Sequence, residues 1–336
     1  MRLVLAVLVL LLCAGCESIS YYGQAIGGHL RLMAAARPID SWLEDPSTPT
    51  ELKVRLETAQ RIRQFASHEL HLPENGSYHS YADLNRRFAV FNVFAAPRLS
   101  VDPKPECFPF TGCVAYRGFY SEDAARKHAA KLREQGYDVH VGGVLAYSTL
   151  GWFDDPLLST FIRYPDSQVA RLVFHELAHQ VAYAKNDTTF NESFAAVVED
   201  EGVRRWLEAE GRKTELAAFH EGQSRKRELA ARIKETRERL KLIYGSGITE
   251  EQKLEQKRAE FDRLRAQFPQ YVPVEPNNAF LVSIALYNEL APALERVLAG
   301  SASLDDFYAR ARSLAASESQ RAELRAQVSA MSTIRP

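Results

Sequence analysis

The chain has 336 residues, of which 46% are hydrophobic and 25% are charged. This composition is that of an ordinary globular protein, and the length is sufficient to bury a substantial core. The formal net charge of −1 excludes a polybasic protein that binds nucleic acid through its bulk charge.

Residues 1–16 have the pattern of a bacterial lipoprotein signal peptide and are not expected to be part of the fold. Arg2 supplies a positive charge, and residues 3–12 form an apolar run that is too short to span a bilayer as a stable helix. The segment ends in Leu-Cys-Ala-Gly-Cys16, which resembles a lipobox with Cys16 as the lipidated first residue of the mature protein. An ordinary cleaved signal peptide is the alternative.

A lipidated Cys16 would attach the protein to a membrane without spanning it. Glu17 follows Cys16, in place of the Asp that commonly signals retention in the inner membrane. The sequence therefore predicts a protein of the bacterial cell envelope that is anchored in the outer membrane and faces the periplasm.

Residues 17–73 are predicted to form an N-terminal helical segment. Ile26, Leu30 and Met33 recur at helical spacing until Arg37-Pro38 stops the run. A second helix is expected after Thr48-Pro49-Thr50.

Residues 74–160 are predicted to form a small α+β lobe. Aromatic and β-branched residues alternate with polar ones over residues 88–94 and 113–120, which is typical of strands. Ser121 can cap a helix that runs to Gln135, and Gly136 ends it. Two further strands are expected, over residues 137–141 and, opened by Gly142-Gly143, over residues 144–148.

Cys107 and Cys113 remain as a pair once the signal peptide is removed and Cys16 is acylated. In an oxidising periplasm such a pair is expected to form a disulfide. The alternative is a redox-active pair, but the spacing is not C-x-x-C.

The end of the lobe is a candidate for substrate binding. Residues 146–153 are interpreted as an edge strand that binds the substrate backbone by strand addition. Asp154 and Asp155 either meet a substrate α-amine or form a turn before Pro156.

A metal motif lies at the start of residues 161–336, which are predicted to form a helical domain. His175-Glu176-Leu177-Ala178-His179 stands in a helix that is expected to begin at Pro165-Asp166 and to run to about Ala184. The two histidines are four residues apart, so their rings project from one helix face and suit two corners of a tetrahedral zinc site. Glu176 is the candidate general base, which takes a proton from a zinc-bound water. The alternative is two histidines that are merely hydrogen-bonded on a buried helix.

Glu192 is the candidate third ligand. It stands near the start of a second helix expected over residues 190–210, which would bring it back to the histidines. A set of two His and one Glu leaves a fourth position for water, as in catalytic zinc sites. The alternative is a capping box with Thr189, in which Glu192 only closes the helix N-terminus.

Two further groups near the motif are candidates for supporting roles. One of Glu199, Asp200 and Glu201 is expected either to hydrogen-bond a ligand imidazole or to lie on a solvated acidic face. A tyrosine is expected to donate to the developing oxyanion, with Tyr287 as the first candidate and Tyr183 and Tyr271 as the others. Tyr287 lies on a helix that Asn277-Asn278 is predicted to cap.

Residues 213–267 are dense in charge and are predicted to form a hairpin of two amphipathic helices. The hairpin is either a solvated protrusion or a docking arm for another protein of the envelope. Its charges have both signs, which is a further argument against nucleic acid as a partner.

The motif resembles that of a known enzyme class. H-E-L-A-H followed by N-E-S-F-A is similar to the glutamate-zincin metallopeptidases, in which an N-E-x-F-A-type helix supplies the third ligand. The chain as a whole resembles a bacterial lipoprotein family classed as aminopeptidases. The stretches that match are the zinc motif and residues 21–30, 107–113, 146–156 and 277–287.

The resemblance implies a mainly helical, zincin-like α+β fold with one zinc ion. It departs from the better-known zinc aminopeptidases in two respects. The loop between His179 and Glu192 is shorter, and the amine-recognition segment G-x-M-E-N is absent. Exopeptidase specificity is therefore implied by the family and not by individual residues.

Two functions follow from these observations. The first is zinc-dependent hydrolysis of a peptide or protein substrate by an envelope-anchored metallopeptidase, with Glu176 as the general base. The second is a lipid-anchored scaffold or assembly factor with a structural or vestigial zinc site.

Overall fold

The computed structural model describes residues 21–108, 112–146 and 148–333. Cys16 and the predicted signal peptide lie outside these residues. Helices make up most of the described chain, and the strands form three small sheets, which confirms the predicted α+β class. Among the described helices, none combines the length and the apolar character needed to cross a bilayer.

The N-terminal segment is helical, as predicted. Residues 21–35 form a first helix, which is followed by β1 (Ala36–Pro38), α2 (Ile39–Glu44) and α3 (Thr50–His68). β1 pairs with β2 (Ser80–Ala82), which in turn pairs with β8 (Leu157–Leu158). Pro38 lacks an N–H group and accordingly lies in an edge strand of this sheet.

The small lobe is built on a three-stranded antiparallel sheet. β3 (Val90–Pro97) lies between β6 (Tyr116–Phe119) and β7 (Tyr137–Val144). The helix α4 (Glu122–Glu134) covers the sheet with buried alanine and leucine side chains. Its N-cap is Ser121, whose side chain accepts the N–H of Ala124, as predicted.

Two strand predictions for this lobe are wrong. β7 continues through Gly142-Gly143 to Val144, where a new strand was predicted to open. A Cβ at Gly143 would lie 2.5 Å from the ring of Phe88, so glycine is needed for close packing within one strand. Residues 148–153 form a turn in place of the expected edge strand, since Leu150 and Gly151 have φ values of 58° and 79°.

The predicted disulfide is confirmed. β4 (Glu106–Phe108) and β5 (Gly112–Val114) form a two-stranded sheet in which Cys107 and Cys113 are paired and bonded through their sulfur atoms. The N–H of Cys113 donates to Oδ1 of Asn186 over 2.7 Å. The disulfide hairpin is thereby attached to the turn that follows the metal motif.

The metal motif lies at the end of α5 (Asp166–Ala178), which packs against α6 (Thr188–Ala209). α5 is shorter than predicted, because it ends at Ala178 and His179 is its C-cap residue. Asp187 caps α6 by accepting the N–H of Phe190 over 3.0 Å. The alternative role of Glu192, a capping box with Thr189, is therefore not supported, because Asp187 and not Thr189 caps the helix.

The predicted helical hairpin is present as α7 (Lys213–Gly245) and α8 (Glu250–Gln267). Thr249 and Gln252 form a capping box at the start of α8. The apolar side chains of both helices pack against α9 (Asn278–Asn288) in a core of their own. These side chains are Ile233, Leu240, Phe261 and Leu264 from the hairpin and Phe280 and Leu281 from α9.

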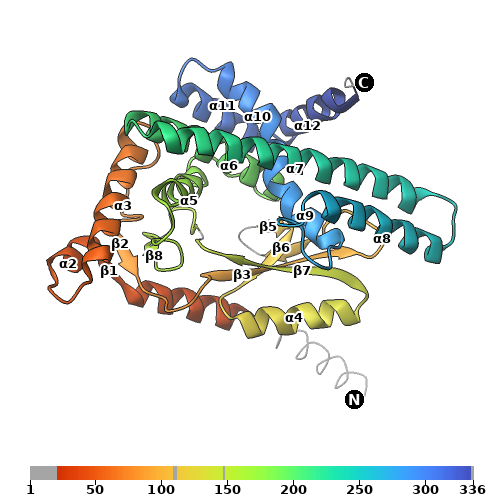
Figure 1. Cartoon of the computed structure of the whole chain (residues 1–336), viewed down its shortest axis with the longest axis horizontal. Coiled ribbons are helices and arrows are strands. Elements are labelled where there is room, and N and C mark those ends of the chain that lie inside the picture. The colour runs from red at the N-terminus through yellow and green to blue at the C-terminus, as the bar shows by residue number, and fades with distance from the viewer. Residues whose placement is uncertain (1–20, 109–111, 147, 334–336) are drawn as a thin grey trace, which may run out of the picture.

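The C-terminal part is helical, as predicted, with Asn277 as the N-cap of α9. It continues through α10 (Ala291–Ala299), α11 (Leu304–Ala316) and α12 (Glu318–Thr333). In Figure 1, α7 is the long helix that runs across the molecule below these last helices, and α10 packs against α6. One hydrophobic core, with members from Leu32 to Val328, joins the N-terminal helices to α5, α6 and the C-terminal helices.

Candidate metal centre

The two histidines of the motif face each other in the interior. His175 and His179 are 8% exposed each, and their ring centroids are 4.9 Å apart. His175 stands in the last turn of α5 and His179 is the C-cap residue, and a helical step of four residues brings both rings to the same face. The structure thus brings the two predicted ligands together.

Glu192 completes the group. Its Oε2 atom lies 3.3 Å from Nε2 of His175 and 3.8 Å from Nε2 of His179. One ligand atom from each of the three buried residues lies within 4.8 Å of the others. Ligand atoms that stand about 2 Å from a tetrahedral ion are about 3.4 Å from one another, so this donor set fits a zinc ion.

A fixed turn directs Glu192 toward the histidines. Its neighbour Asn191 holds the backbone of Ala184 at both polar groups: Oδ1 accepts the N–H over 2.7 Å, and Nδ2 donates to the carbonyl over 3.0 Å. The Asn-Glu pair of the motif therefore has two functions in the structure. Asn191 locks the connection between α5 and α6, and Glu192 presents a carboxylate to the rings.

Of the three acidic candidates of α6, Glu199 is the one that contacts a candidate ligand, His175. Its Oε2 atom lies 2.8 Å from Nδ1 of His175, which leaves Nε2 of this ring for a metal. Its Oε1 atom lies 3.2 Å from Nε of Arg171 and 3.8 Å from Nζ of Lys226. Burial opposes the charge, but Arg171, His175 and Lys226 lower the pKa of Glu199 to about 2.

Arg171 was not considered in the sequence analysis. A signal for it exists, because it stands one helical turn before His175 on the same face of α5. Asp200 and Glu201 have other partners: Gln223 hydrogen-bonds Asp200, and Arg204 and Arg205 bind Glu201.

The charges of the site favour a cation at the rings. Burial lowers the pKa of His179 to about 4, so this ring is neutral at pH 7, as a metal ligand must be. Burial also opposes a charge on His175, but hydrogen bonds to the carboxylates of Glu192 and Glu199 raise its pKa to about 10. These two carboxylates stabilise a proton on His175, and a divalent cation at the rings would supply the positive charge in its place.

Glu176 is a buried carboxyl group beside the ligands. It is 7% exposed, and burial raises its pKa to about 8, although the neighbouring His175 acts in the opposite direction. A buried carboxylate with a raised pKa next to a metal group has the properties of a general base.

The carboxylate of Glu192 acts electrostatically on three tyrosines. The ring centroid of Tyr287 in α9 is 6.1 Å from that of His175. The carboxylate of Glu192 and burial raise the pKa of Tyr287 well above its usual value. Burial and the same carboxylate raise the pKa of Tyr183 and of Tyr116 in β6. All three hydroxyls are therefore protonated and able to donate.

Two tyrosines differ from what the sequence predicts, one that was not a candidate and one that was. Tyr116 was missed, because nothing local in the sequence indicates that a strand of the small lobe reaches the ligands. Tyr271 is 46% exposed and lies beside Arg225 of α7. No contact found in the described part of the chain joins Tyr271 to the metal group.

The turn of residues 148–155 lies next to the metal motif. Gly151 faces the side chain of Gln180, the residue that follows His179, and a Cβ there would lie 3.3 Å from Oε1. Gln180 also accepts from Nδ2 of Asn75 over 2.7 Å. Asp154 is exposed, whereas Asp155 is buried and accepts the N–H of Thr149 over 2.8 Å. The turn interpretation of this pair is therefore the one that the geometry favours.

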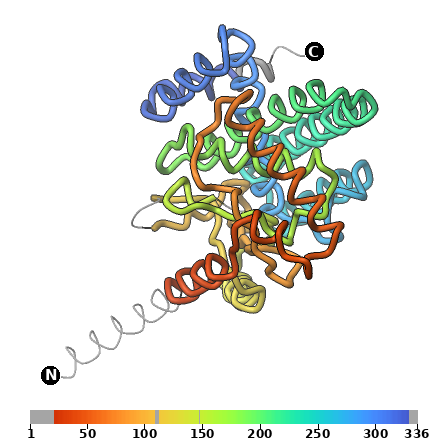
Figure 2. The backbone as a smooth tube through the Cα atoms, turned by 90° about the vertical axis from the view of Figure 1, so that its left-hand side faces the viewer, coloured from red at the N-terminus to blue at the C-terminus, as the bar shows by residue number. Residues whose placement is uncertain are grey.

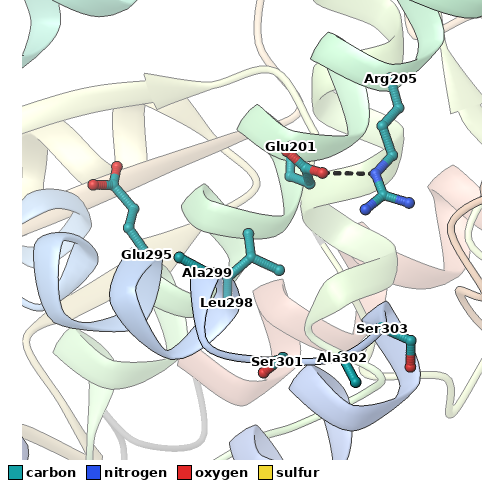
Figure 3. Close-up of a pocket in the computed structure, with 8 residues that line it drawn as sticks. All are labelled: Glu201, Arg205, Glu295, Leu298, Ala299, Ser301, Ala302 and Ser303. Atoms are coloured by element: carbon teal, nitrogen blue, oxygen red, sulfur yellow. Dashed lines mark hydrogen bonds and ion pairs between the residues drawn. The ribbon is translucent and has the colours of Figure 1, made fainter.

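A separate hollow of about 310 Å³ lies between α6, α10 and the segment 298–303. Figure 3 shows Glu201 paired with Arg205 at its wall and Glu295 at its other side. None of the metal-group residues lines it. We therefore place the candidate site at the buried ligands and not in this hollow.

Comparisons with known proteins give one match. The model of a family described as "Putative aminopeptidase" matches residues 20–325, which is nearly the whole chain. Neither the curated proteins nor the solved structures contain a match.

Proposed function

The chain belongs to the family described as "Putative aminopeptidase", and from this membership and the buried metal group we propose that it is a zinc-dependent aminopeptidase of the bacterial cell envelope. His175, His179 and Glu192 would hold the zinc ion. Cys16 would carry the lipid that anchors the chain, in the outer membrane and facing the periplasm. The observation that carries the proposal is the buried carboxyl of Glu176, which follows His175 in the chain and interacts electrostatically with His175 and Glu192.

A bound zinc ion supplies Lewis-acid chemistry, because it polarises a peptide carbonyl and makes a water molecule more acidic. The residues of the chain have the remaining tasks. Glu176 takes the proton of the attacking water and passes it to the leaving amine. Glu199 fixes the ring of His175, and Tyr287 donates to the carbonyl oxygen as it becomes negative.

The substitution Glu176→Gln tests the proposal. We expect the variant to keep about one zinc per chain, because Glu176 is not a ligand, and to lose about 10²–10⁴-fold in hydrolysis, because the base is gone. Zinc is measured by elemental analysis, and hydrolysis with a panel of peptides whose amino termini are free or blocked. Glu208→Gln, an exposed position on the same helix as Glu192, is the control and should retain both.

The panel also separates the other outcomes. Glu192→Ala should lose zinc together with activity, because it removes a ligand. Cleavage of blocked peptides at equal rates would show an endopeptidase. A zinc-loaded wild-type chain that cleaves no peptide would contradict the proposal and support a scaffold, and so would full activity in Glu176→Gln.

A further inference from the structure

The first helix, residues 21–35, is firmly packed on its inner face. The ring of Tyr21 lies 5.5 Å from the rings of Phe108 and Phe119. Oε1 of Gln24 accepts the N–H of Tyr120 over 3.1 Å. Gly28 lies so close to Tyr120 that a Cβ would stand 2.3 Å from its ring, so the helix contacts the small lobe directly. The position of this helix is therefore fixed by the fold.

The outer face of the same helix is apolar as well. Tyr22, Ile26 and Leu30 are 38%, 59% and 58% exposed, and they follow one another in steps of four residues along one stripe. The remaining exposed positions are Gly23, Arg31 and Ala34. Arg31 is the one charged residue of the helix, and its guanidinium bonds the carbonyl of Gly27. A helix in contact with water normally has a polar outer face, and one that is apolar all round is normally covered.

Two aromatic side chains extend this surface. Trp152 is 82% exposed and Phe153 is 52% exposed, both in the turn beside Gln180. The ring of Phe153 lies 4.6 Å from that of His29, which stands on the helix between Ile26 and Leu30. We call Tyr22, Ile26, Leu30, Trp152 and Phe153 the apolar face. It reaches from the first helix to the turn next to the metal group.

We propose that the apolar face lies in the interfacial region of a lipid bilayer. The described chain begins at Tyr21, five residues after Cys16, and five extended residues span at most about 17 Å. A lipid on Cys16 therefore holds the helix within that distance of the membrane, so this step rests on the anchoring part of the proposed function. Figure 2 shows the N-terminal end of the first helix leading out of the body of the molecule.

The residue types of the face suit this environment. Tryptophan and tyrosine are enriched where a bilayer meets water, and a helix with an exposed apolar face and little charge lies in the plane of that boundary. The length and composition of the face fit contact with the surface of the bilayer and not insertion across it. In this orientation the turn that carries Trp152, beside Gln180 of the metal motif, lies at the membrane.

Fluorescence of the acylated protein in vesicles tests the proposal. Trp152 is exposed, whereas Trp206 is 2% exposed and Trp42 is partly buried, so a change of environment is reported mainly by Trp152. In vesicles of phosphatidylethanolamine and phosphatidylglycerol we expect a shift of emission to shorter wavelength and quenching by brominated acyl chains. Trp152→Phe should abolish both signals. If iodide quenches the tryptophan emission as strongly in the presence of vesicles as in solution, the proposal is overturned.

Binding without the lipid separates the face from the anchor. The mature chain without residues 1–16, which contains every residue that the structure describes, should sediment with the same vesicles. Ile26→Glu and Leu30→Glu should each lower vesicle binding about tenfold, because each replaces a large apolar side chain that the membrane contact would bury with a charged one. Leu242→Glu is the control, since Leu242 is 76% exposed but lies on α7, outside the face.

The readouts keep this proposal distinct from the proposed function. Vesicle binding does not depend on zinc or on hydrolysis, so an inactive chain that binds vesicles would overturn only the peptidase. An active chain whose binding is equal in Ile26→Glu, Leu30→Glu and Leu242→Glu would overturn only the apolar face. Capture of a second protein through this face, with no vesicle binding, would also overturn it.

Discussion

Asp155 is a buried carboxyl group with few compensating contacts. It is 1% exposed, and Oδ2 accepts the N–H of Thr149, while Oδ1 has no hydrogen-bond partner among the described residues. Burial raises its pKa from the ordinary 3.8 to about 6. Above pH 6, Asp155 is therefore charged in the folded protein, where burial makes the charge less favourable than it is in the unfolded chain.

The sign of the resulting pH dependence follows from linkage. The folded state binds the proton of Asp155 more tightly than the unfolded state does. The contribution of Asp155 to the free energy of unfolding therefore becomes less favourable as the pH rises from about 4 to about 6. Asp155→Asn removes the charge, so we expect it to raise the free energy of unfolding at pH 7.5 by up to about 3 kcal/mol. The gain should vanish near pH 4. Urea unfolding at several pH values measures this, and a gain independent of pH would contradict it.

The sequence predicted best which three residues come together in the candidate metal group. The i, i+4 spacing of His175 and His179 fixes their common face, so only the third ligand required a choice. The choice of Glu192 over a helix cap agrees with its position, since Asp187 makes the cap. Tyr116 could not be predicted, because its approach to Glu192 depends on how the lobe packs against α6.

At the scale of elements, the distance between α5 and α6 is set by Gly202. A Cβ at this position would lie 2.7 Å from the ring of Phe174 and 2.8 Å from Leu70. Phe174 directly precedes His175, so a shift of the α5 backbone at Phe174 also shifts a candidate ligand. A glycine in the middle of a helix has an energetic cost that close packing offsets here.

We expect Gly202→Ala to lower the free energy of unfolding by about 1–3 kcal/mol, because the core must shift to accept the methyl group. Zinc affinity should fall as well, since His175 moves with Phe174. Gly222→Ala in α7 is the matched control: nothing lies within 4 Å of its added Cβ, and it should stabilise the protein by about 0.5–1 kcal/mol. Urea unfolding and zinc titration are the measurements. Equal behaviour of the two variants would refute this role of Gly202.

The elements themselves were predicted well where local signals exist. Ser121 and Asn277 cap helices as expected, because their side chains accept N–H groups of the first turn. The end of α5 was predicted too late, since the apolar residues after His179 continue the helical pattern although the chain turns there. The turn at residues 148–153 was mistaken for a strand, because nothing in the sequence indicates the positive φ of Leu150.

At the scale of the whole molecule, the charged hairpin is tied to the small lobe. Nζ of Lys257 in α8 lies 2.6 Å from Oδ2 of Asp138 in β7 and donates to the carbonyl of Arg98 over 2.9 Å. Oδ2 of Asp138 also accepts the N–H of Asn278, at the start of α9, over 2.9 Å. One carboxylate thus joins the hairpin, the sheet and the helix that carries Tyr287.

We expect Lys257→Met to lower the free energy of unfolding by about 3 kcal/mol, because it leaves the largely buried charge of Asp138 without its cation. Lys241→Met is the control, since Lys241 pairs with Glu238 on the exposed surface of α7 and should contribute less than about 1 kcal/mol. Thermal unfolding of both variants decides the matter. A change at Lys257→Met as small as that at Lys241→Met would show that the contact between the hairpin and the lobe does not stabilise the fold.

This attachment was beyond prediction from the sequence. The hairpin itself follows from its periodic apolar residues, but Lys257 and Asp138 are 119 positions apart. A lysine in a run of mixed charge is normally solvated, and only the tertiary fold buries this one. The proposed docking arm for an envelope partner remains a separate hypothesis about the exposed remainder of the hairpin.

The early end of α5 has an electrostatic consequence. Because His179 is the C-cap residue, the candidate ligands stand at the C-terminal end of the helix. The peptide dipoles of α5 place a partial negative charge at this end, which attracts a cation before any side chain is counted. If the regular helix continued for three residues beyond His179, its end would lie past the rings, and the backbone would contribute less to the proposed binding of a cation.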